Sequence, residues 1–371
     1  MDREELVRAG LYDPDAPNAP ERLALLDWLA DHGASIDQML RSDAMGSLSS
    51  AAGDAAVRPG RGISLDELCE QSGLTVHQVR AVLLNAGTAP AGGDEPVFLE
   101  SDVATFRAFK LASEIFGIDA VLQFVRVLGS SMARVAEAAI SLFQLNVEAN
   151  IDRTPRGALE LAKANYEAVL ALDLVPQAMA GLFRLHMEQG IRRSRAAYFQ
   201  PDPYGSRRLC VGFVDLVGFT ALTRQLPEVE LAGLIERFEG NTNEIVTRYD
   251  GRVVKYVGDE VMYIAVTASA ACEIALEIVD AFDGPDSTVQ PHGGLAIGGL
   301  VARGGDYYGP IVNLASRIAD IAVPTEVLVT EEVKDAGESA SIEFSPAGRR
   351  MLKGFAEPVE LWAVTRSRRG A

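Results

Sequence analysis

Arg252 to Val266 read RVVKYVGDEVMYIAV, in which two apolar, β-rich runs flank a tight turn. Short runs of this composition are typical of paired, buried strands, and the turn VGDE places Asp259 between them. Similar runs occur before and after this hairpin, at Leu209–Val214, Gly294–Ala302 and Val359–Val364. The second half of the chain is therefore expected to contain a β-sheet.

Apolar residues at helical spacing separate those strands. One such pattern runs from Leu231 to Tyr249, and another runs from Ala268 to Phe282. The resulting order of strand, helix, hairpin, helix and strand predicts an α+β domain with a ferredoxin-like βαββαβ sandwich.

The first half of the chain has few β-branched runs and many amphipathic stretches, which predicts an all-helical domain. Its last helix is expected over about 176–199, because the following QPDPYGSRR contains two prolines and a glycine. We therefore expect a helical domain at 1–202 and the α+β domain at 203–371. The stretch SLSSAAGDAAVRPGRG (47–62) is predicted to be a loop.

Composition excludes several classes of protein. The 371 residues are 48% hydrophobic and 23% charged, as in globular proteins, and the net charge of -18 disfavours nucleic-acid binding. Three widely spaced cysteines, Cys69, Cys210 and Cys272, indicate neither a disulfide framework nor a zinc module. The charged N-terminus and the lack of a long uninterrupted apolar run predict a cytoplasmic protein without a membrane span.

Two carboxylates stand at predicted strand ends. Asp215 directly follows the strand Leu209–Val214, and Asp259 lies in the hairpin turn. If these strands are neighbours in one sheet, the two side chains can converge on a hard cation such as Mg²⁺, which prefers oxygen ligands. An aspartate at a turn also commonly hydrogen-bonds the backbone, so each residue alone has an ordinary structural explanation.

A polar pair lies on a predicted helix further along the chain. In IVNLASRIADI (Ile311–Ile321) the apolar residues form one stripe, whereas Asn313 and Arg317 lie about one helical turn apart on a different face. The two side chains can therefore point together into a cleft. An exposed polar pair on a helix surface would show the same spacing.

Four motifs occur together in the order FVDLVGFT (213–220), KYVGDE (255–260), DYYGPIVNLASR (306–317) and LKGF (352–355). Together they resemble the catalytic domain of the class III nucleotide cyclases over about 209–364. The resemblance implies two divalent cations, Mg²⁺ or Mn²⁺, at Asp215 and Asp259, and in-line attack of a ribose 3′-hydroxyl on the α-phosphate with release of pyrophosphate. It also implies that Arg317 stabilises the transition state and that Asn313 orients the ribose.

Lys255 and Asp306 match the positions at which this family reads the purine ring. An ammonium donor beside a carboxylate acceptor complements adenine N1 and N6, whereas guanine reverses both polarities. The resemblance therefore implies ATP as substrate and cyclic AMP as product. Further matches are the triphosphate-binding lysine and the first motif, whose backbone amides can approach the phosphates; these residues are Lys353, Phe213, Gly218 and Phe219.

In this family one chain supplies the metal-binding aspartates, and the other supplies the residues that read the base and hold the ribose. All of these residues occur in one chain here. The resemblance therefore implies a homodimer with two equivalent composite sites.

Residues 1 to about 200 resemble the regulatory domain of soluble actinobacterial adenylyl cyclases, chiefly through RVLGSSMARVAEA (126–138). This resemblance implies regulation by the helical domain and, as in some relatives, by pH. His186 is the candidate sensor, because it lies on the predicted connecting helix and histidine titrates between about pH 5 and 8. We expect activity to rise as pH falls. Protons or a lipid-like molecule are the regulatory ligands considered.

Two alternatives stay open at this point. The first is a diguanylate or guanylate cyclase; diguanylate cyclases share the fold and a G-D-E turn, but VGDEV lacks their paired glycines. The second is a catalytically silent nucleotide- or DNA-binding regulator, because Ser64–Gly87 resembles a helix-turn-helix. No basic arms flank that segment, which disfavours nucleic acid as a partner.

Overall fold

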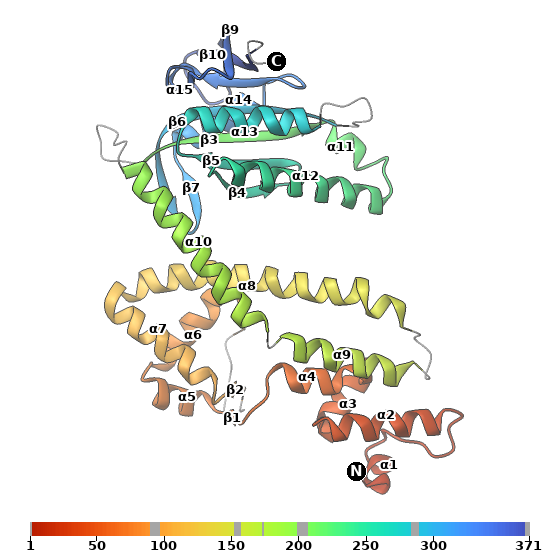
Figure 1. Cartoon of the computed structure of the whole chain (residues 1–371). Coiled ribbons are helices and arrows are strands. Elements are labelled where there is room, and N and C mark those ends of the chain that lie inside the picture. Colours follow the sequence, from red (N-terminus) through yellow and green to blue (C-terminus); the bar gives the residue numbers. More distant parts are fainter. Residues whose placement is uncertain are drawn as a thin grey trace. The chain divides into compact units, whose positions relative to one another are not determined.

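The computed structural model of the chain describes residues 2–89, 97–151, 157–172, 174–198, 207–282 and 289–367. The chain divides into two compact units, 1–184 and 185–371, and each is described by itself (Figure 1). Most of the predicted boundary sequence QPDPYGSRR lies outside the described residues.

Helices dominate the first unit, as the sequence predicts. One group packs around Leu26, Leu29 and Met39 and consists of α1 (Arg3–Arg8), α2 (Ala19–Asp31), α3 (Ile36–Ala44), α4 (Ala51–Val57) and α9 (Ala158–Leu172). A second group packs around Leu68 and Val79 and consists of α5 (Leu65–Ser72), α6 (Val76–Ala86), α7 (Asp102–Phe116) and α8 (Ile118–Asn146). A short helix, η2 (Glu148–Asn150), follows α8.

Two local features of this unit differ from the prediction. The expected loop over 47–62 is wrong, because η1 (Leu48–Ser50) and α4 occupy most of it. Ala51 and Ala52 of α4 pack into the first core. In addition, β1 (Gly62–Ile63) and β2 (Phe98–Leu99) pair in a short antiparallel ladder, so the unit is not purely helical.

Polar caps explain where several of these helices begin and end. Ser35, Ser64 and Thr75 each form a capping box with the glutamine or glutamate three residues later. Gly73 and Gly87 end α5 and α6 in the left-handed conformation, at φ +71° and +80°. The helix pair predicted over Ser64–Gly87 is therefore present.

The second unit is built on a mixed sheet in the order β4–β5–β3–β6–β8–β10–β9, with β7 paired to β6. Its strands are β3 (Arg207–Val217), β4 (Arg252–Val257), β5 (Glu260–Ala265), β6 (Gln290–Arg303), β7 (Asp306–Tyr308), β8 (Val327–Thr330), β9 (Ile342–Arg350) and β10 (Val359–Arg366). Its helices are α11 (Phe219–Leu222), α12 (Glu228–Arg248), α13 (Ala268–Ala281), α14 (Pro310–Ala319) and α15 (Glu331–Gly337), while α10 (Val175–Tyr198) runs across the division between the units. The antiparallel strands β3 to β6 with α12 and α13 give the predicted βαββαβ order.

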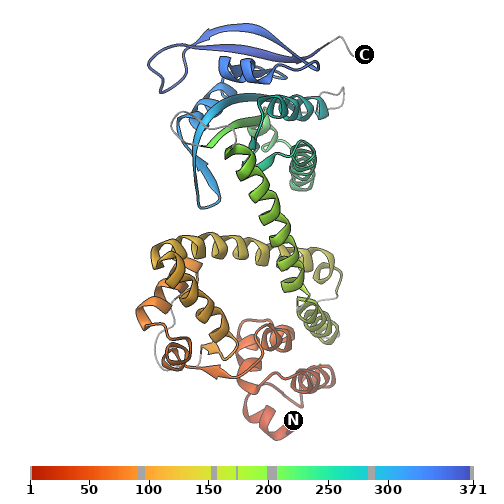
Figure 2. The same cartoon turned by 60° about the vertical axis from the view of Figure 1, so that its left-hand side comes forward.

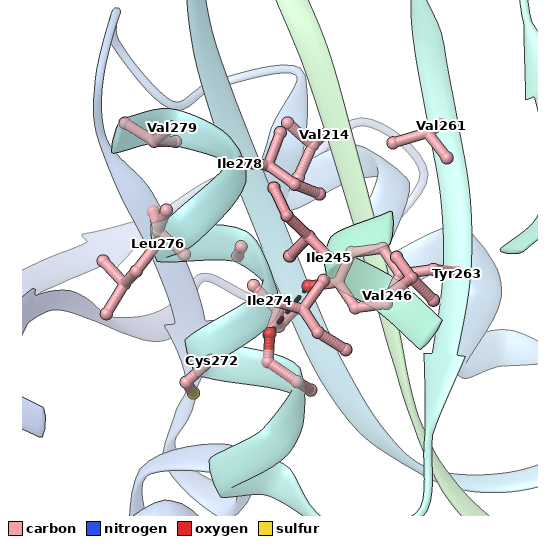
Figure 3. Packing of buried hydrophobic residues seen from close by; sticks show 14 of the residues in the cluster. Val214, Ile245, Val246, Val261, Tyr263, Cys272, Ile274, Leu276, Ile278 and Val279 are labelled. Carbon is pink, nitrogen blue, oxygen red and sulfur yellow. Dashed lines mark hydrogen bonds between the residues drawn. The ribbon is translucent and has the colours of Figure 1, made fainter. Parts of the chain in front are cut away.

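Alternation along the strands gives the sheet two different faces. Val214 and Tyr263 point to the face covered by α12 and α13, where they pack with Ile245 and Ile274 (Figure 3). The Tyr263 hydroxyl donates a hydrogen bond of 2.7 Å to the Ala271 carbonyl oxygen, so this buried polar group is satisfied.

The opposite face of the sheet carries α14. Phe213 and Ala296 pack there against Ala315 and Ala319. Gly294 of β6 permits this close approach, because a Cβ atom at that position would lie 2.2 Å from the Ala319 backbone nitrogen. The helix that carries Asn313 and Arg317 is therefore fixed closely on the sheet.

The sequence does not predict β9. Its residues IEFSPAGRR include a proline, a glycine and several polar side chains, which are depleted in strand interiors. β9 forms the edge of the sheet, and its pairing with β10 shifts register between Leu361 and Trp362.

Candidate active site

Asp215 lies near the end of β3, between two neighbouring strands. The register places it opposite Glu260 of β5 on one side and opposite His292 of β6 on the other. Asp259 occupies the turn between β4 and β5, after Gly258 at φ +68°. β3 and β5 are neighbours, so the structure brings Asp215 and Asp259 together.

Crowding of carboxylates raises pKa values in this cluster. Burial raises the pKa of Asp259, and like-charge repulsion from Asp215 raises it further. Burial also raises the pKa of Glu260 to about 7, with added repulsion from Asp215, Asp320 and Asp259. Four carboxylates therefore lie close together, namely those of Asp215, Asp259, Glu260 and Asp320.

His292 is the basic neighbour of Asp215. Its Nε2 atom lies 3.5 Å from Asp215 Oδ2, and its Nδ1 atom lies 2.7 Å from the Ala322 carbonyl oxygen. Burial lowers the pKa of His292, but the Asp215 carboxylate and the Ala322 carbonyl outweigh burial and leave the pKa raised. Sequence reasoning missed His292 as a site residue; its one signal is a polar side chain early in a mainly apolar strand.

Asp215 and Asp259 fit a divalent-cation site. Carboxylate oxygens are the ligands that Mg²⁺ and Mn²⁺ prefer, and a cation beside the two would relieve their repulsion. Within the described ranges, no group of three or more His, Cys, Asp or Glu side chains could hold a metal by itself.

Lys255 of β4 and Asp306 of β7 contact each other. Lys255 Nζ donates a hydrogen bond of 2.5 Å to Asp306 Oδ2, and Asp306 Oδ1 accepts one of 2.7 Å from the Tyr307 backbone N–H. The Lys255 and Asp306 side chains are 42% and 23% exposed. A donor and an acceptor therefore lie side by side where a ligand can reach them.

Asn313 and Arg317 lie on α14, apart from its buried residues. The Asn313 side chain is exposed, and Arg317 Nη1 donates a hydrogen bond of 2.6 Å to Asp320 Oδ2. Asp320 is one of the carboxylates that raise the pKa of Glu260. The C-terminal end of α14 therefore lies near the carboxylate cluster of the same chain.

The structure places the remaining predicted residues on the second unit, outside the contacts described above. Lys353 is exposed between β9 and β10, and its side chain has no hydrogen bond or ion pair within the described part of the chain. Phe213 and Phe219 are buried on opposite faces of the sheet. Gly218, exposed at φ +82°, precedes Phe219 in a conformation that glycine adopts readily.

Comparison with known proteins matches both halves of the chain. Residues 202–366 match the family model described as Adenylate and Guanylate cyclase catalytic domain, and residues 2–190 match the Adenylate cyclase regulatory domain. A pH-sensitive adenylate cyclase of Mycobacterium tuberculosis is 30% identical over 365 residues, which cover 95% of this chain and 89% of that protein. The chain belongs to the class III adenylate cyclases.

Two further proteins are similar to this adenylate cyclase. An uncharacterized protein of Mycobacterium tuberculosis is 31% identical over 367 residues, covering 97% of this chain and 93% of that protein. The crystal structure of the adenylyl cyclase CyaB from P. aeruginosa is 27% identical, with a TM-score of 0.39 over 44% of this chain and 96% of that chain.

The end of α10 reaches the catalytic sheet through Arg193 and not through the predicted sensor. Burial lowers the pKa of Arg193, the like charge of Arg252 lowers it further, and Tyr307 and Asp250 oppose the shift. His186 is exposed on the same helix, and its side chain makes no hydrogen bond or ion pair within the described ranges. The basic end of α10 in this adenylate cyclase therefore borders β4 and β7.

Two other expectations concern the first unit and α10. Among the described residues, one helical stretch, Ala158–Ala196, is long and apolar enough to cross a membrane by length and composition alone. Length and composition alone do not show a membrane span. The α5–α6 pair has the helix-turn-helix order, but α6 exposes only His77 and Arg80 as basic side chains, so nothing favours the DNA-binding alternative.

Proposed function

We propose that this enzyme converts ATP to 3′,5′-cyclic AMP and pyrophosphate, with Lys255 and Asp306 reading the adenine. The observation that carries the choice of ATP is the 2.5 Å contact between Lys255 Nζ and Asp306 Oδ2. Lys255 can donate to adenine N1 while Asp306 accepts from the N6 amino group. Guanine would present a donor to the ammonium and an acceptor to the carboxylate, which leaves both protein groups without partners.

Asp215 and Asp259 hold two divalent cations, Mg²⁺ or Mn²⁺, in this proposal. When bound there, the ions supply Lewis acidity that lowers the pKa of the ribose 3′-hydroxyl and offsets the triphosphate charge. The chain contributes two converging carboxylates whose mutual repulsion disfavours the metal-free state. His292, 3.5 Å from Asp215 Oδ2, limits the orientation of that carboxylate.

Other residues orient the substrate for an in-line displacement. The ribose 3′-hydroxyl releases its proton to water, and O3′ forms a bond to the α-phosphorus. The bond between the α-phosphorus and the oxygen that bridges to the β-phosphate breaks, and pyrophosphate leaves with the negative charge. Arg317 supplies a fixed cation at the α-phosphoryl oxygens, and Asn313 on the same helix orients the ribose. The residues that hold the triphosphate, through charge or exposed backbone amides, are Lys353 and Gly218. Phe219 packs beneath the loop, whereas Phe213 lies on the opposite face of the sheet.

Each site takes residues from two copies of the chain in this proposal, although the C-terminal end of α14 also lies near the carboxylate cluster of its own chain. Within the described residues, no hydrogen bond or ion pair links Lys255 or Asp306 to Asp215 or Asp259. A second chain can complete each site, and a twofold homodimer then holds two equivalent sites.

Apolar surface on the first unit supports this homodimer. Along the 29 residues of α8 only Val121 and Val125 are buried. Four large apolar side chains on the same helix are exposed by 51% to 74%, namely Phe124, Ile140, Leu142 and Leu145. Surfaces of this kind commonly mark an interface.

Residues 1–202 act in this proposal as a regulatory domain for the catalytic residues 203–371, and the enzyme works in the cytoplasm. The similarity to a pH-sensitive adenylate cyclase supports protons as the signal, with a lipid-like molecule as the other candidate. α10, expected over about 176–199, carries both His186 and Arg193 and is the element that connects the two parts.

Product identification tests the proposed reaction. Purified full-length protein is incubated with ATP or GTP, in Mg²⁺ and in Mn²⁺, at about pH 5.5 and 8. We expect cyclic AMP from ATP, no product from Asp215→Ala or Asp259→Ala, and normal activity from the control Asp335→Ala on α15. Cyclic GMP as the main product would contradict base reading by Lys255 and Asp306, and no cyclic nucleotide would overturn the reaction itself.

A further inference from the structure

An irregularity in β4 places two basic side chains on the same face of the sheet. In the register with β5, Arg252 lies opposite Ile264, and Lys255 lies opposite Met262. Three steps along β4 therefore match two along β5, with Val254 as the extra residue of a β-bulge. In a regular strand Arg252 and Lys255 would point to opposite faces, because successive side chains alternate. The bulge puts them together.

These two side chains contact three consecutive residues of the β6–β7 hairpin. Arg252 Nη2 donates a hydrogen bond of 2.8 Å to the Gly305 carbonyl oxygen, and its guanidinium carbon lies 5.8 Å from the centroid of the Tyr307 ring. Asp306, between those two residues, accepts the 2.5 Å hydrogen bond from Lys255. Arg252 therefore contacts the residue on each side of Asp306, and Lys255 contacts the Asp306 carboxylate itself.

The β6–β7 hairpin loses conformational freedom when it becomes ordered, and contacts of this kind offset that loss. It extends beyond the neighbouring strands (Figure 2), and its turn consists of Gly304 and Gly305 at φ +62° and +81°. This is the two-residue turn that suits a hairpin, but consecutive glycines lose much conformational freedom on ordering. β7 itself contains only Asp306–Tyr308. A restraint on Gly305 and Tyr307 thus narrows the positions open to Asp306.

We propose that Arg252 is a positioning residue for base recognition, which holds the β6–β7 hairpin so that Asp306 faces Lys255 in the geometry that adenine requires. The inference rests on the proposed role of Lys255 and Asp306 in reading the base. Arginine suits the task because its planar guanidinium donates to a carbonyl and packs on an aromatic face at once. A lysine at the same position keeps the charge but not the fork.

Steady-state kinetics of the full-length enzyme with ATP and with GTP test this role. For Arg252→Ala we expect a higher KM for ATP, a smaller change in kcat and a loss of about ten-fold in the ATP-over-GTP ratio of kcat/KM. Arg252→Lys should fall between this variant and the wild type. The matched control is Arg303→Ala, because the Arg303 side chain is exposed on the same hairpin and makes no hydrogen bond or ion pair in the described residues. It should keep the wild-type ratio.

A double-mutant cycle separates positioning from a general effect on folding. If Arg252 acts through Asp306, Arg252→Ala should not change the nucleotide ratio further in an Asp306→Ala background. A purely structural role would instead lower kcat for both nucleotides alike together with the melting temperature. If Arg252→Ala does not fold, Tyr307→Leu and Arg252→Lys each remove part of the restraint and should lower the ratio by smaller factors.

The outcomes distinguish this inference from the proposed function. An unchanged ratio in folded Arg252→Ala, while Asp306→Ala changes it, would overturn the positioning role and leave base reading intact. An unchanged ratio in both variants would overturn base reading by Asp306 and with it the inference. A wild-type enzyme that forms no cyclic nucleotide would reject the proposed function itself.

Discussion

Repulsion between Asp215 and Asp259 has a consequence for stability that is separate from catalysis. Asp259 has a raised pKa because it is buried and lies near Asp215. Asp259→Asn should therefore raise the melting temperature of the metal-free protein while it reduces cyclic AMP formation by about 10³-fold or more. Melting curves in a chelator and rate assays in Mn²⁺ check both parts, with Asp335→Asn as the control. Retained activity would contradict the role of Asp259.

Glu260 should make the stability of the metal-free protein depend on pH. Its pKa rises from 4.5 to about 7, first through burial, so the folded chain binds this proton more tightly than the unfolded chain does. Stability from Glu260 is then fully present below about pH 4.5 and is lost as pH rises through about 7. In Glu260→Gln the fall in melting temperature over that range should be smaller. Identical pH slopes in a chelator would disprove the assignment.

At the scale of elements, the contact between α14 and β6 couples stability to activity. A Cβ atom at Gly294 would meet the α14 backbone, so Gly294→Ala should cost about 1–3 kcal/mol of unfolding free energy and lower kcat by displacing Asn313 and Arg317. Gly240 on α12 has open space around it. The control Gly240→Ala should be neutral or stabilising by up to about 1 kcal/mol and leave kcat unchanged. Urea unfolding gives the change in unfolding free energy, and rate assays give kcat. A Gly294→Ala enzyme with the stability and kcat of the control would refute the coupling between stability and activity.

The sequence predicts an element well when the element has its own pattern of apolar residues. The apolar runs and helical spacings correctly gave β3 to β6, α12 and α13, and the position of Asp259 in a turn followed from the hairpin. β9 was not predicted, because its polar composition is not typical of a strand and its strand conformation depends on pairing with β10. The helices within 47–62 were not predicted for a similar reason, because packing of Ala51 and Ala52 into the core stabilises them.

Prediction of the candidate site from sequence has the same limit, because contacts between distant segments are not encoded in a local pattern. The family resemblance, and not the spacing of the residues, suggested that Lys255 and Asp306 act together. Their contact depends on a β-bulge that the local sequence pattern does not predict. His292 was missed because its relation to Asp215 arises from strand register across about 80 residues of sequence. Pairing across a sheet is a property of the assembled fold.

At the scale of the whole molecule, a pH response through α10 is testable in the intact enzyme. We expect higher activity at about pH 5.5 than at pH 8, because histidine is the side chain that ordinarily changes charge in this range and His186 lies on the connecting helix α10. His186→Gln should bring the ratio of the two activities close to 1. His77→Gln, which removes another exposed helical histidine, should leave the ratio unchanged. A His186→Gln enzyme with the wild-type ratio would show that another group senses pH.

The composite site of the homodimer is most directly tested by mixing two inactive variants. Asp215→Ala removes a metal ligand and Arg317→Ala removes the transition-state cation, so each variant alone should form almost no cyclic AMP. If one chain supplies Asp215 and its partner supplies Arg317, half of the dimers in an equal mixture after exchange are mixed, and each of those has one intact site. The account predicts recovery of about one quarter of the wild-type activity. No recovery, with mixed dimers demonstrated by differently tagged chains, would contradict it.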